Sequence, residues 1–252
     1  MELISLPFFS EKCGAAKSSI SEDLAIINRV FHIEGIGQLE SNSGASGGVR
    51  YMPRIGNEIS ESVVATLCQQ LEDPERILPG GYLFMSDILG DPSTIREIGR
   101  LFASRFATLN IDSIVTVATK GIPLAYATAS YLNVPVIIVR RDPKVTEGST
   151  VSINYVSGSS KKIQTMVLSK RSLRAGENVC IIDDFMKAGG TINGIKSLLK
   201  EFDAKVKAIG VLAEAEDEEE ERVVDDYTSL LQIKNVDSNN QQIEVIKGNY
   251  FQ

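Results

Sequence analysis

The sequence predicts an α/β fold: a parallel sheet with helices on both faces, preceded by a small separate N-terminal unit. From about Ile77 to Leu212, apolar strand-like runs alternate with helical patterns, which is the order of a parallel α/β sheet. One of these runs ends in two adjacent carboxylates, at the strand end where open α/β sheets bind ligands. The first 53 residues differ, because two helical segments precede a glycine-rich pair of strands.

Composition and charge exclude several classes of protein. The 252-residue chain has a net charge of −7, so the charge of the protein as a whole gives no reason to expect attraction to nucleic acid or membranes. Three scattered cysteines give no disulfide framework, and a single histidine, His32, excludes a multi-histidine metal site. Because no apolar run reaches the ~20 residues of a membrane span and no signal peptide is evident, we expect a cytoplasmic protein without a metal site or a membrane partner.

The N-terminal unit has the element order of a winged helix domain. A short helix is followed by a turn at Gly14, a second helix over Ser18 to Val30, and two strands over Gly37 to Glu40 and Val49 to Tyr51. Helix, turn, helix and a two-stranded wing are typical of a DNA-binding module. We expect phosphate contacts from the second helix and the wing, through Lys17, Ser18, Ser19, Ser21 and Arg50.

Charge favours a different interpretation of the same segment. Residues 1–54 hold five basic and six acidic residues, a net charge of −1, which is not the pattern of a DNA-binding surface. A dimerisation or capping segment, or a protein-interaction module, therefore stays open.

A helix is predicted to link the N-terminal unit to the sheet. This helix carries Ile59, Val63, Leu67 and Leu71 at intervals of four, so one of its faces is apolar and belongs to the core. We therefore divide the chain into residues 1–54, a linker helix over 55–74 and an α/β domain over 75–252.

Four apolar runs are predicted to form the parallel sheet. They cover Ser113 to Ala118, Val134 to Val139, Val179 to Ile182 and Val206 to Leu212. Between the second and third runs, Ser149 to Ser169 alternates polar and apolar residues around a GSSKK turn, which predicts an antiparallel hairpin. From the residues alone, a solvent-exposed hairpin with no role stays open.

The segment VCIIDDFMKAGGT, from Val179 to Thr191, carries the strongest functional signal. Asp183 and Asp184 end the buried strand. The turn into the next helix contains Ala188, Gly189, Gly190 and Thr191. Such a turn can curl into a nest of backbone N–H groups that binds phosphate, aided by the helix dipole. Carboxylates beside a phosphate nest suit a sugar phosphate, and a strand–turn–helix connection with incidental acids is the alternative.

This pattern resembles the phosphoribosyl pyrophosphate motif of the type I phosphoribosyltransferases. The resemblance implies that Asp183 and Asp184 hold the ribose 2′- and 3′-hydroxyls and that the following loop holds the 5′-phosphate. Two positions depart from an active enzyme's usual loop: Lys187 stands where many members have a small residue or an acid, and Ala188 where Thr is common. A lysine cannot act as a carboxylate base, so the residue at position 187 argues against catalysis.

The whole chain closely resembles the purine operon repressors of Gram-positive bacteria. The motifs that carry this resemblance are AKSSISEDL (16–24), DPERILPGGY (73–82), VATKGIPLAYA (117–127), KVTEGSTVSINYVSGSS (144–160) and IIDDFMKAGGTING (181–194). They imply a type I phosphoribosyltransferase fold with a flexible hairpin hood, preceded by a small winged helix domain. The implied protein is a homodimer without transferase activity that binds double-stranded DNA upstream of purine genes. Phosphoribosyl pyrophosphate, with Mg²⁺, would be the effector that weakens DNA binding.

The resemblance also implies roles for residues outside that loop. Thr119, Lys120 and Gly121 match the loop that contacts pyrophosphate, Lys144 begins the hood region, and Tyr82 lies on the entry segment. Lys187 would add positive charge beside the phosphates. A further hypothesis is that the same pocket accepts guanosine tetraphosphate, which also carries two pyrophosphate-type groups on a ribose.

The family normally has a further segment before this start, with a basic arm and the first helix of the winged domain. Because cations that neutralise DNA phosphates supply salt-dependent affinity, we expect weaker DNA binding unless the start is clipped or misassigned. The alternative function is a catalytically active purine phosphoribosyltransferase with an added N-terminal domain.

Overall fold

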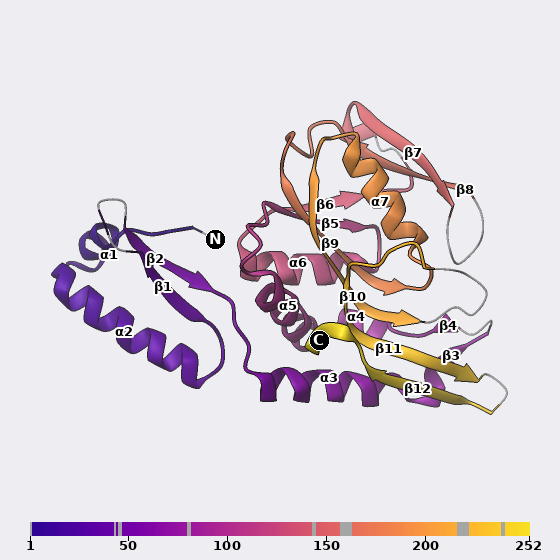
Figure 1. Ribbon diagram of the computed structural model, residues 1–252, viewed down its shortest axis with the longest axis horizontal. Coiled ribbons are helices and arrows are strands. Elements are labelled where there is room, and N and C mark those ends of the chain that lie inside the picture. Colours follow the sequence, from indigo (N-terminus) through magenta and orange to yellow (C-terminus); the bar gives the residue numbers. More distant parts are fainter. Residues whose placement is uncertain are drawn as a thin grey trace.

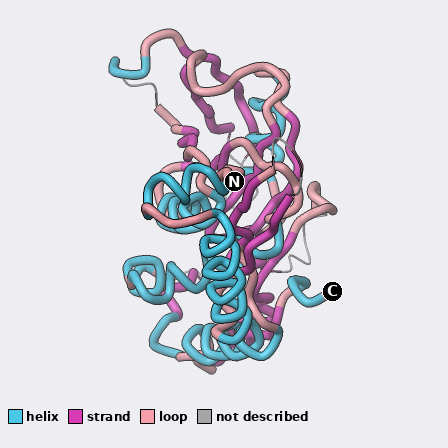
Figure 2. Tube along the Cα trace, turned by 90° about the vertical axis from the view of Figure 1, so that its left-hand side faces the viewer, coloured by secondary structure: helices cyan, strands magenta, loops and turns pink. Residues whose placement is uncertain are grey.

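The computed structural model describes residues 2–42, 44, 47–79, 82–142, 145–156, 163–215, 222–237 and 240–252. A small N-terminal unit stands beside a larger α/β body, and the chain passes from one to the other near Pro53 (Figure 1). With the N-terminal unit turned toward the viewer, its helices lie in front of the body (Figure 2). None of the helices in the described ranges is long and apolar enough to cross a lipid bilayer.

The N-terminal unit has the predicted order of helix, turn, helix and two strands. Helix α1 (Leu6–Cys13) begins at Ser5, whose hydroxyl accepts from the Phe8 N–H, and ends at Gly14 with φ of 64°. Helix α2 (Lys17–Ile33) follows, and β1 (Gln38–Asn42) pairs antiparallel with β2 (Gly48–Met52). The predicted helix–turn–helix and its two-stranded ribbon are therefore confirmed as elements.

A six-stranded sheet forms the centre of the body, in the order β12-β11-β10-β9-β5-β6. The four predicted strands are confirmed as β5 (Ser113–Val117), β6 (Val136–Val139), β9 (Asn178–Met186) and β10 (Lys205–Ala215). They pair in parallel, as their unbroken apolar runs predict. Two further strands, β11 (Thr228–Asp237) and β12 (Gln242–Lys247), extend the sheet, and β12 is antiparallel to β11.

These last two strands did not follow from the sequence. Strand β11 begins with Thr228 and Ser229, which are buried, so its apolar run starts late. Strand β12 lies at the edge and buries only Ile243 and Val245, which leaves a short alternating pattern. Edge strands and strands that bury polar groups lack the continuous apolar signal of a central strand.

Helices cover both faces of the sheet and enclose two apolar cores. Helices α3 (Asn57–Leu71), α5 (Pro92–Phe106) and α6 (Gly121–Leu132) enclose the first core, and α7 (Gly190–Lys200) with a hairpin encloses the second (Figure 1). Shorter elements connect the first group: β3 (Ile77–Leu78), β4 (Tyr82–Leu83) and α4 (Ser86–Gly90).

The predicted linker helix is confirmed as α3, but its predicted apolar face is partly wrong. The buried residues are Ser60, Val64, Leu67 and Leu71, whereas Ile59 is 36% exposed. An α-helix has 3.6 residues per turn, so residues spaced four apart lie at successively different angles around its axis. A set of residues at intervals of four therefore does not stay on the buried face. The observed face alternates steps of four and three, and it packs on β11 and β12.

The antiparallel hairpin between β6 and β9 is confirmed. Strands β7 (Thr150–Val156) and β8 (Ile163–Ser169) pair in register from Thr150 opposite Ser169 to Val156 opposite Ile163. The predicted GSSKK turn lies outside the described residues. Both strands of the hairpin pack on α7, the helix that follows the candidate phosphate loop.

Candidate functional site

A cavity of about 1120 Å³ opens near the carboxyl ends of the central strands. Its walls come from six places in the chain: the entry segment, the loop after β5, the segment after β6, the end of β9 with its following loop, the end of β10, and the end of β11. The predicted effector residues that line it are Tyr82, Thr119, Lys120, Asp183, Asp184, Lys187 and Thr191. Ligand sites of open α/β sheets lie at this edge.

Two carboxylates lie side by side in the wall of this cavity. Asp183 is 6% exposed, Asp184 is half-buried, and the Asp184 backbone N–H donates to Asp183 Oδ1 at 3.0 Å. Burial, and then the neighbouring charge of Asp184, raise the pKa of Asp183 well above its usual value. Burial also raises the pKa of Asp184, while Asp183 and Lys120 act in the opposite direction. Such a pair gains from a ligand that supplies hydroxyl donors or positive charge.

The loop between β5 and α6 comes close to these carboxylates. Its Ala118–Thr119 peptide is cis, and Lys120 precedes the first residue of α6, Gly121. A Cβ on Gly121 would overlap Thr116 Oγ1 and lie 3.0 Å from Asp183 Oδ1. Glycine is therefore required for this close approach. Gly121 does not line the cavity, but it allows Thr119 and Lys120 to do so.

The candidate phosphate loop runs from the end of β9 into α7. Gly189 is the N-cap of α7 with φ of 84°, a conformation that favours glycine. Lys187 and Thr191 line the cavity, whereas the three predicted residues between them do not: Ala188 is buried, and Gly189 and Gly190 form the turn into α7. The positive end of the α7 dipole therefore faces the same cavity as the carboxylates.

Some predicted residues are placed differently, and others were missed. Lys144 lies outside the described residues, and Tyr82 is 64% exposed at the cavity mouth. Arg140, Arg141 and Asp142 also line the cavity, directly after β6. The run of two arginines after a predicted strand was a usable signal, because neighbouring parallel strands end at one edge of the sheet.

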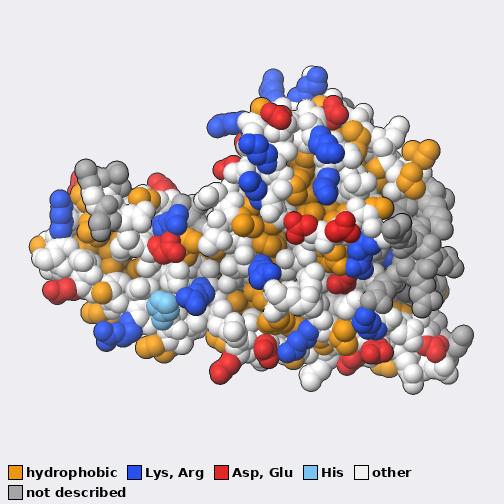
Figure 3. All heavy atoms as spheres, in the orientation of Figure 1, with side chains coloured by type: hydrophobic (Ala, Val, Ile, Leu, Met, Phe, Trp, Pro, Cys, Tyr) orange, Lys and Arg blue, Asp and Glu red, His pale blue; other side chains and the backbone are white. Residues whose placement is uncertain are grey.

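The predicted DNA contacts lie at the surface of the N-terminal unit. Lys17, Ser18, Ser19 and Ser21 are exposed in the first turns of α2. On the wing, Arg50 Nη2 lies 2.8 Å from Glu40 Oε2 on the neighbouring strand, so this arginine already has an acidic partner. The face drawn in Figure 3 mixes basic and acidic side chains over this unit, beside the single histidine, His32.

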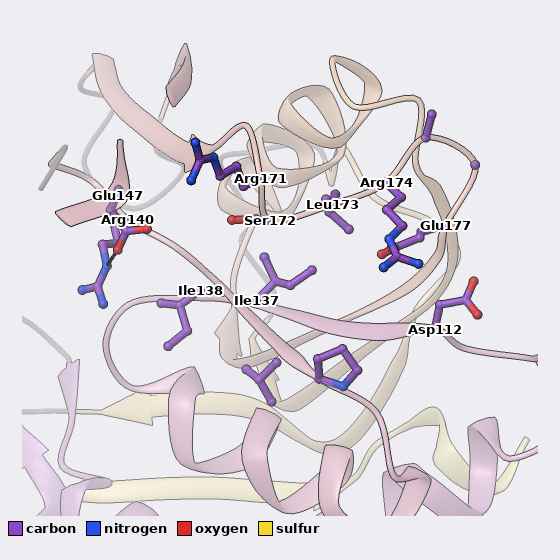
Figure 4. A pocket seen from close by; sticks show the side chains of 14 residues that line it. Asp112, Ile137, Ile138, Arg140, Glu147, Arg171, Ser172, Leu173, Arg174 and Glu177 are labelled. Carbon is purple, nitrogen blue, oxygen red and sulfur yellow. Dashed lines mark ion pairs between the residues drawn. The ribbon is translucent and has the colours of Figure 1, made fainter. Parts of the chain in front are cut away.

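A second cavity, of about 900 Å³, lies beside the edge strand β6 (Figure 4). Arg171, Leu173 and Arg174 project over β6 from the segment that follows β8 (Figure 4). None of the predicted effector residues lines it. Within the part of the chain that the structure describes, no group of three or more His, Cys, Asp or Glu side chains could hold a metal ion.

Two family models match this chain. The model for the N-terminal domain of the bacterial purine repressor matches residues 1–53, and the model for the phosphoribosyl transferase domain matches residues 85–245.

Several curated relatives match almost the entire chain, and two of them carry different functional names. The purine biosynthesis transcriptional repressor PurR of Bacillus subtilis is 61% identical over 250 residues, which is 99% of this chain and 87% of the relative. The purine biosynthesis transcriptional activator PurR of Lactococcus lactis subsp. lactis is 48% identical over 250 residues, covering 99% of this chain and 92% of the relative. Relatives of this similarity thus include one named a repressor and one named an activator.

Among solved structures, the adenine phosphoribosyltransferase of Thermoanaerobacter pseudethanolicus superposes with a TM-score of 0.57. The match covers 66% of this chain and 98% of that one, at 20% sequence identity. At this identity the likeness concerns the fold alone: the body has the type I phosphoribosyltransferase fold that the sequence predicts.

Proposed function

Because this chain belongs to the bacterial purine repressor family, we propose that it is a transcriptional repressor of purine biosynthesis genes. It binds operator DNA upstream of these genes through residues 1–54. Residues 75–252 bind phosphoribosyl pyrophosphate, which relieves DNA binding, and the helix over residues 55–74 links the two parts. The relative with the higher identity is named a repressor, which favours repression over activation.

The observation that carries the sensing proposal is the meeting of three groups at one cavity. Asp183 and Asp184 would accept from the ribose hydroxyls, the loop from Lys187 to Thr191 would take the 5′-phosphate, and Thr119 and Lys120 would contact the pyrophosphate. Residues of all three groups, with Lys187 and Thr191 from the loop, line the same 1120 Å³ space, which suits a ligand with a phosphate at one end and a pyrophosphate at the other.

Mg²⁺ would enter together with this effector. Magnesium prefers oxygen ligands and keeps several waters, and it is usually held by substrate phosphates plus one or two carboxylates. Asp183 and Asp184 supply carboxylates of the required kind beside the place proposed for ribose. The ion would neutralise part of the charge that the effector brings to these acids.

Transfer of a purine base is the alternative, and Lys187 speaks against it. This side chain lines the cavity at the position where an acid in an active enzyme can interact with the base. An ammonium group cannot serve as that carboxylate. We therefore propose binding without catalysis, and an assay for pyrophosphate release with adenine, guanine, hypoxanthine or xanthine tests it. Release well above the rate without enzyme would establish the alternative.

The same cavity supports a second effector hypothesis. Guanosine tetraphosphate carries two pyrophosphate-type groups on a ribose, so it matches both phosphate-binding loops. A competition titration against phosphoribosyl pyrophosphate decides the matter, and the absence of displacement would remove the hypothesis.

A gel-shift titration with DNA from upstream of a purine biosynthetic operon tests the proposed function. We expect a shift that phosphoribosyl pyrophosphate with Mg²⁺ reverses. Sedimentation of the same sample tests the proposed homodimer. No shift at low salt would contradict the repressor proposal for this chain, and would favour a protein-interaction role for residues 1–54.

A further inference from the structure

The candidate phosphate loop has a second layer of support behind it. The Val223 backbone N–H donates to the Ala188 carbonyl at 3.0 Å. Val224 is fully buried, and its Cγ2 lies 3.0 Å from where a Cβ on Gly189 would stand. Residues 222–224 therefore contact the backbone of the loop at two successive positions. The loop's shape depends on where this short segment is held.

A buried carboxylate, Glu214, holds that segment. Glu214 is 4% exposed at the end of β10, where it pairs with Met186, the last residue of β9 before the loop. Arg222 Nη1 lies 2.6 Å from Glu214 Oε2, and the Tyr227 hydroxyl donates to the same oxygen at 2.5 Å. Ser229 Oγ donates to Glu214 Oε1 at 2.6 Å. Both carboxylate oxygens thus have partners.

The arginine is itself fixed from several sides. Arg222 Nη2 donates to the Ala215 carbonyl at 3.3 Å, and its guanidinium lies 5.2 Å from the centre of the Tyr227 ring. Since Ala215 lines the cavity, the Glu214–Arg222 pair lies directly behind the cavity wall. A planar guanidinium held by carboxylate, carbonyl and ring has little freedom to move.

We propose that Glu214 and Arg222 are positioning residues for the phosphomonoester end of the ligand. Through Val223 and Val224 they fix the backbone of Ala188 and Gly189 in the shape that receives the 5′-phosphate. Arg222 also neutralises a buried carboxylate that would otherwise repel a phosphate dianion. This inference rests on the proposed function, because it assigns the roles of the loop within the same effector site.

The inference predicts a selective loss. In the Arg222→Met variant the loop loses its support, whereas the pyrophosphate-contacting residues Thr119 and Lys120 belong to a different loop. We expect ribose 5-phosphate to bind about tenfold more weakly, as when residues that orient a binding group are removed. Inorganic pyrophosphate should bind as it does to the unaltered protein. Arg222→Lys, which keeps the charge, should recover part of the loss.

Isothermal titration calorimetry of the full chain with each probe is the test. Arg174→Met is the matched control, because it makes the same change at an exposed arginine on the second cavity. Loss of one partner of a buried ion pair can unfold a protein. Val224→Ala leaves the ion pair intact and should also weaken ribose 5-phosphate selectively.

The outcomes separate this inference from the function on which it rests. Binding of both probes to the unaltered protein, with a selective loss in Arg222→Met and Val224→Ala, supports it. Equal weakening of both probes, or no change relative to Arg174→Met, overturns it and leaves the proposed function intact. If the unaltered protein binds neither probe, the proposed function fails, and the inference fails with it.

Discussion

At the scale of single residues, the most informative group is the buried carboxyl of Asp183. It is buried beside a second carboxyl, and both effects raise its pKa above the usual 3.8. A group whose pKa is raised by folding stabilises the native state fully below its unfolded pKa, and that stabilisation is lost as pH rises through the folded pKa. Asp183 should therefore make the ligand-free protein less stable near neutral pH than in mild acid.

The Asp183→Asn variant tests this carboxyl. Without ligand at pH 7 we expect a higher Tm than in the unaltered protein, by about 2–4 °C for each kcal/mol gained. The gain should be smaller at pH 4, because a carboxyl with a raised pKa takes up its proton before the pH falls that far. Thermal melts at both pH values measure it, with Asp142→Asn as a control at an exposed carboxylate of the same cavity. An equal gain at both pH values would contradict the argument.

The sequence predicted much of the site at this scale, for a physical reason. Asp183, Asp184 and Lys187 lie within one strand and its loop, so local pattern alone brings them together. Arg140 and Arg141 reach the same cavity from a strand two positions away in the sheet. Glu214 and Arg222 lie behind the wall of the cavity. Their position follows only from the packing of residues 222–224 on the loop.

At the scale of elements, the hairpin and α7 form one packed unit. Gly194 of α7 faces Tyr155 of β7, and a Cβ on Gly194 would lie 2.9 Å from Tyr155 Cγ and 3.2 Å from Met166 Sδ. Tyr155 and Met166 are buried there. The proposed hood is therefore attached to the helix that begins at the proposed phosphate site, through Tyr155 near the turn end of the hairpin and Met166 in the middle of β8.

Gly194→Ala should loosen this attachment. An added methyl must displace the Tyr155 ring, which in a packed core costs about 1–3 kcal/mol. We expect faster amide hydrogen exchange in β7 and β8 and unchanged exchange in β5. Gly90→Ala is the control, because a Cβ there meets no atom within 4 Å. Unchanged exchange in the hairpin would show that the ring is readily displaced and that the two elements are independent.

The elements were predicted correctly where the buried residues are apolar, and less well where polar residues are buried among them. The central strands are buried on both faces, so their apolar runs are unbroken. Strand β11 carries Ser229, whose buried hydroxyl donates to Glu214 and accepts from the Asn249 N–H. In α3 the buried face contains Ser60 in place of Ile59. The helical period is 3.6 residues, whereas the prediction took residues at intervals of four.

At the scale of the whole molecule, a buried arginine joins the N-terminal unit to the body. Arg100 of α5 is 8% exposed and donates through Nη2 to the carbonyl of Gly35, in the turn between α2 and β1. Near it, the Ile55 N–H donates to Ser104 Oγ at 3.1 Å. The sequence did not predict how the two parts contact each other. The contact depends on a buried arginine that donates to a backbone carbonyl, and no side-chain pattern marks such a carbonyl.

Arg100→Met should weaken this attachment. The Gly35 carbonyl would lose its charged donor, a change worth about 1.5–3 kcal/mol. We expect limited proteolysis between Ile33 and Asn57 to accelerate several-fold, while the thermal transition of the α/β body changes little. Arg96→Met makes the same change at an exposed position of the same helix and should behave as the unaltered protein does. Equal cleavage rates in all three proteins would show that Arg100 does not hold the N-terminal unit.

The central claim is that the two parts divide the work of DNA binding and sensing, and Asp184→Ala tests it most directly. Fluorescence anisotropy with labelled operator DNA would give its affinity with and without phosphoribosyl pyrophosphate and Mg²⁺, beside the unaltered protein. We predict operator affinity close to that of the unaltered protein and no release by the ligand. A folded Asp184→Ala protein that has lost DNA binding, or that still releases DNA when the ligand is added, would contradict the claim.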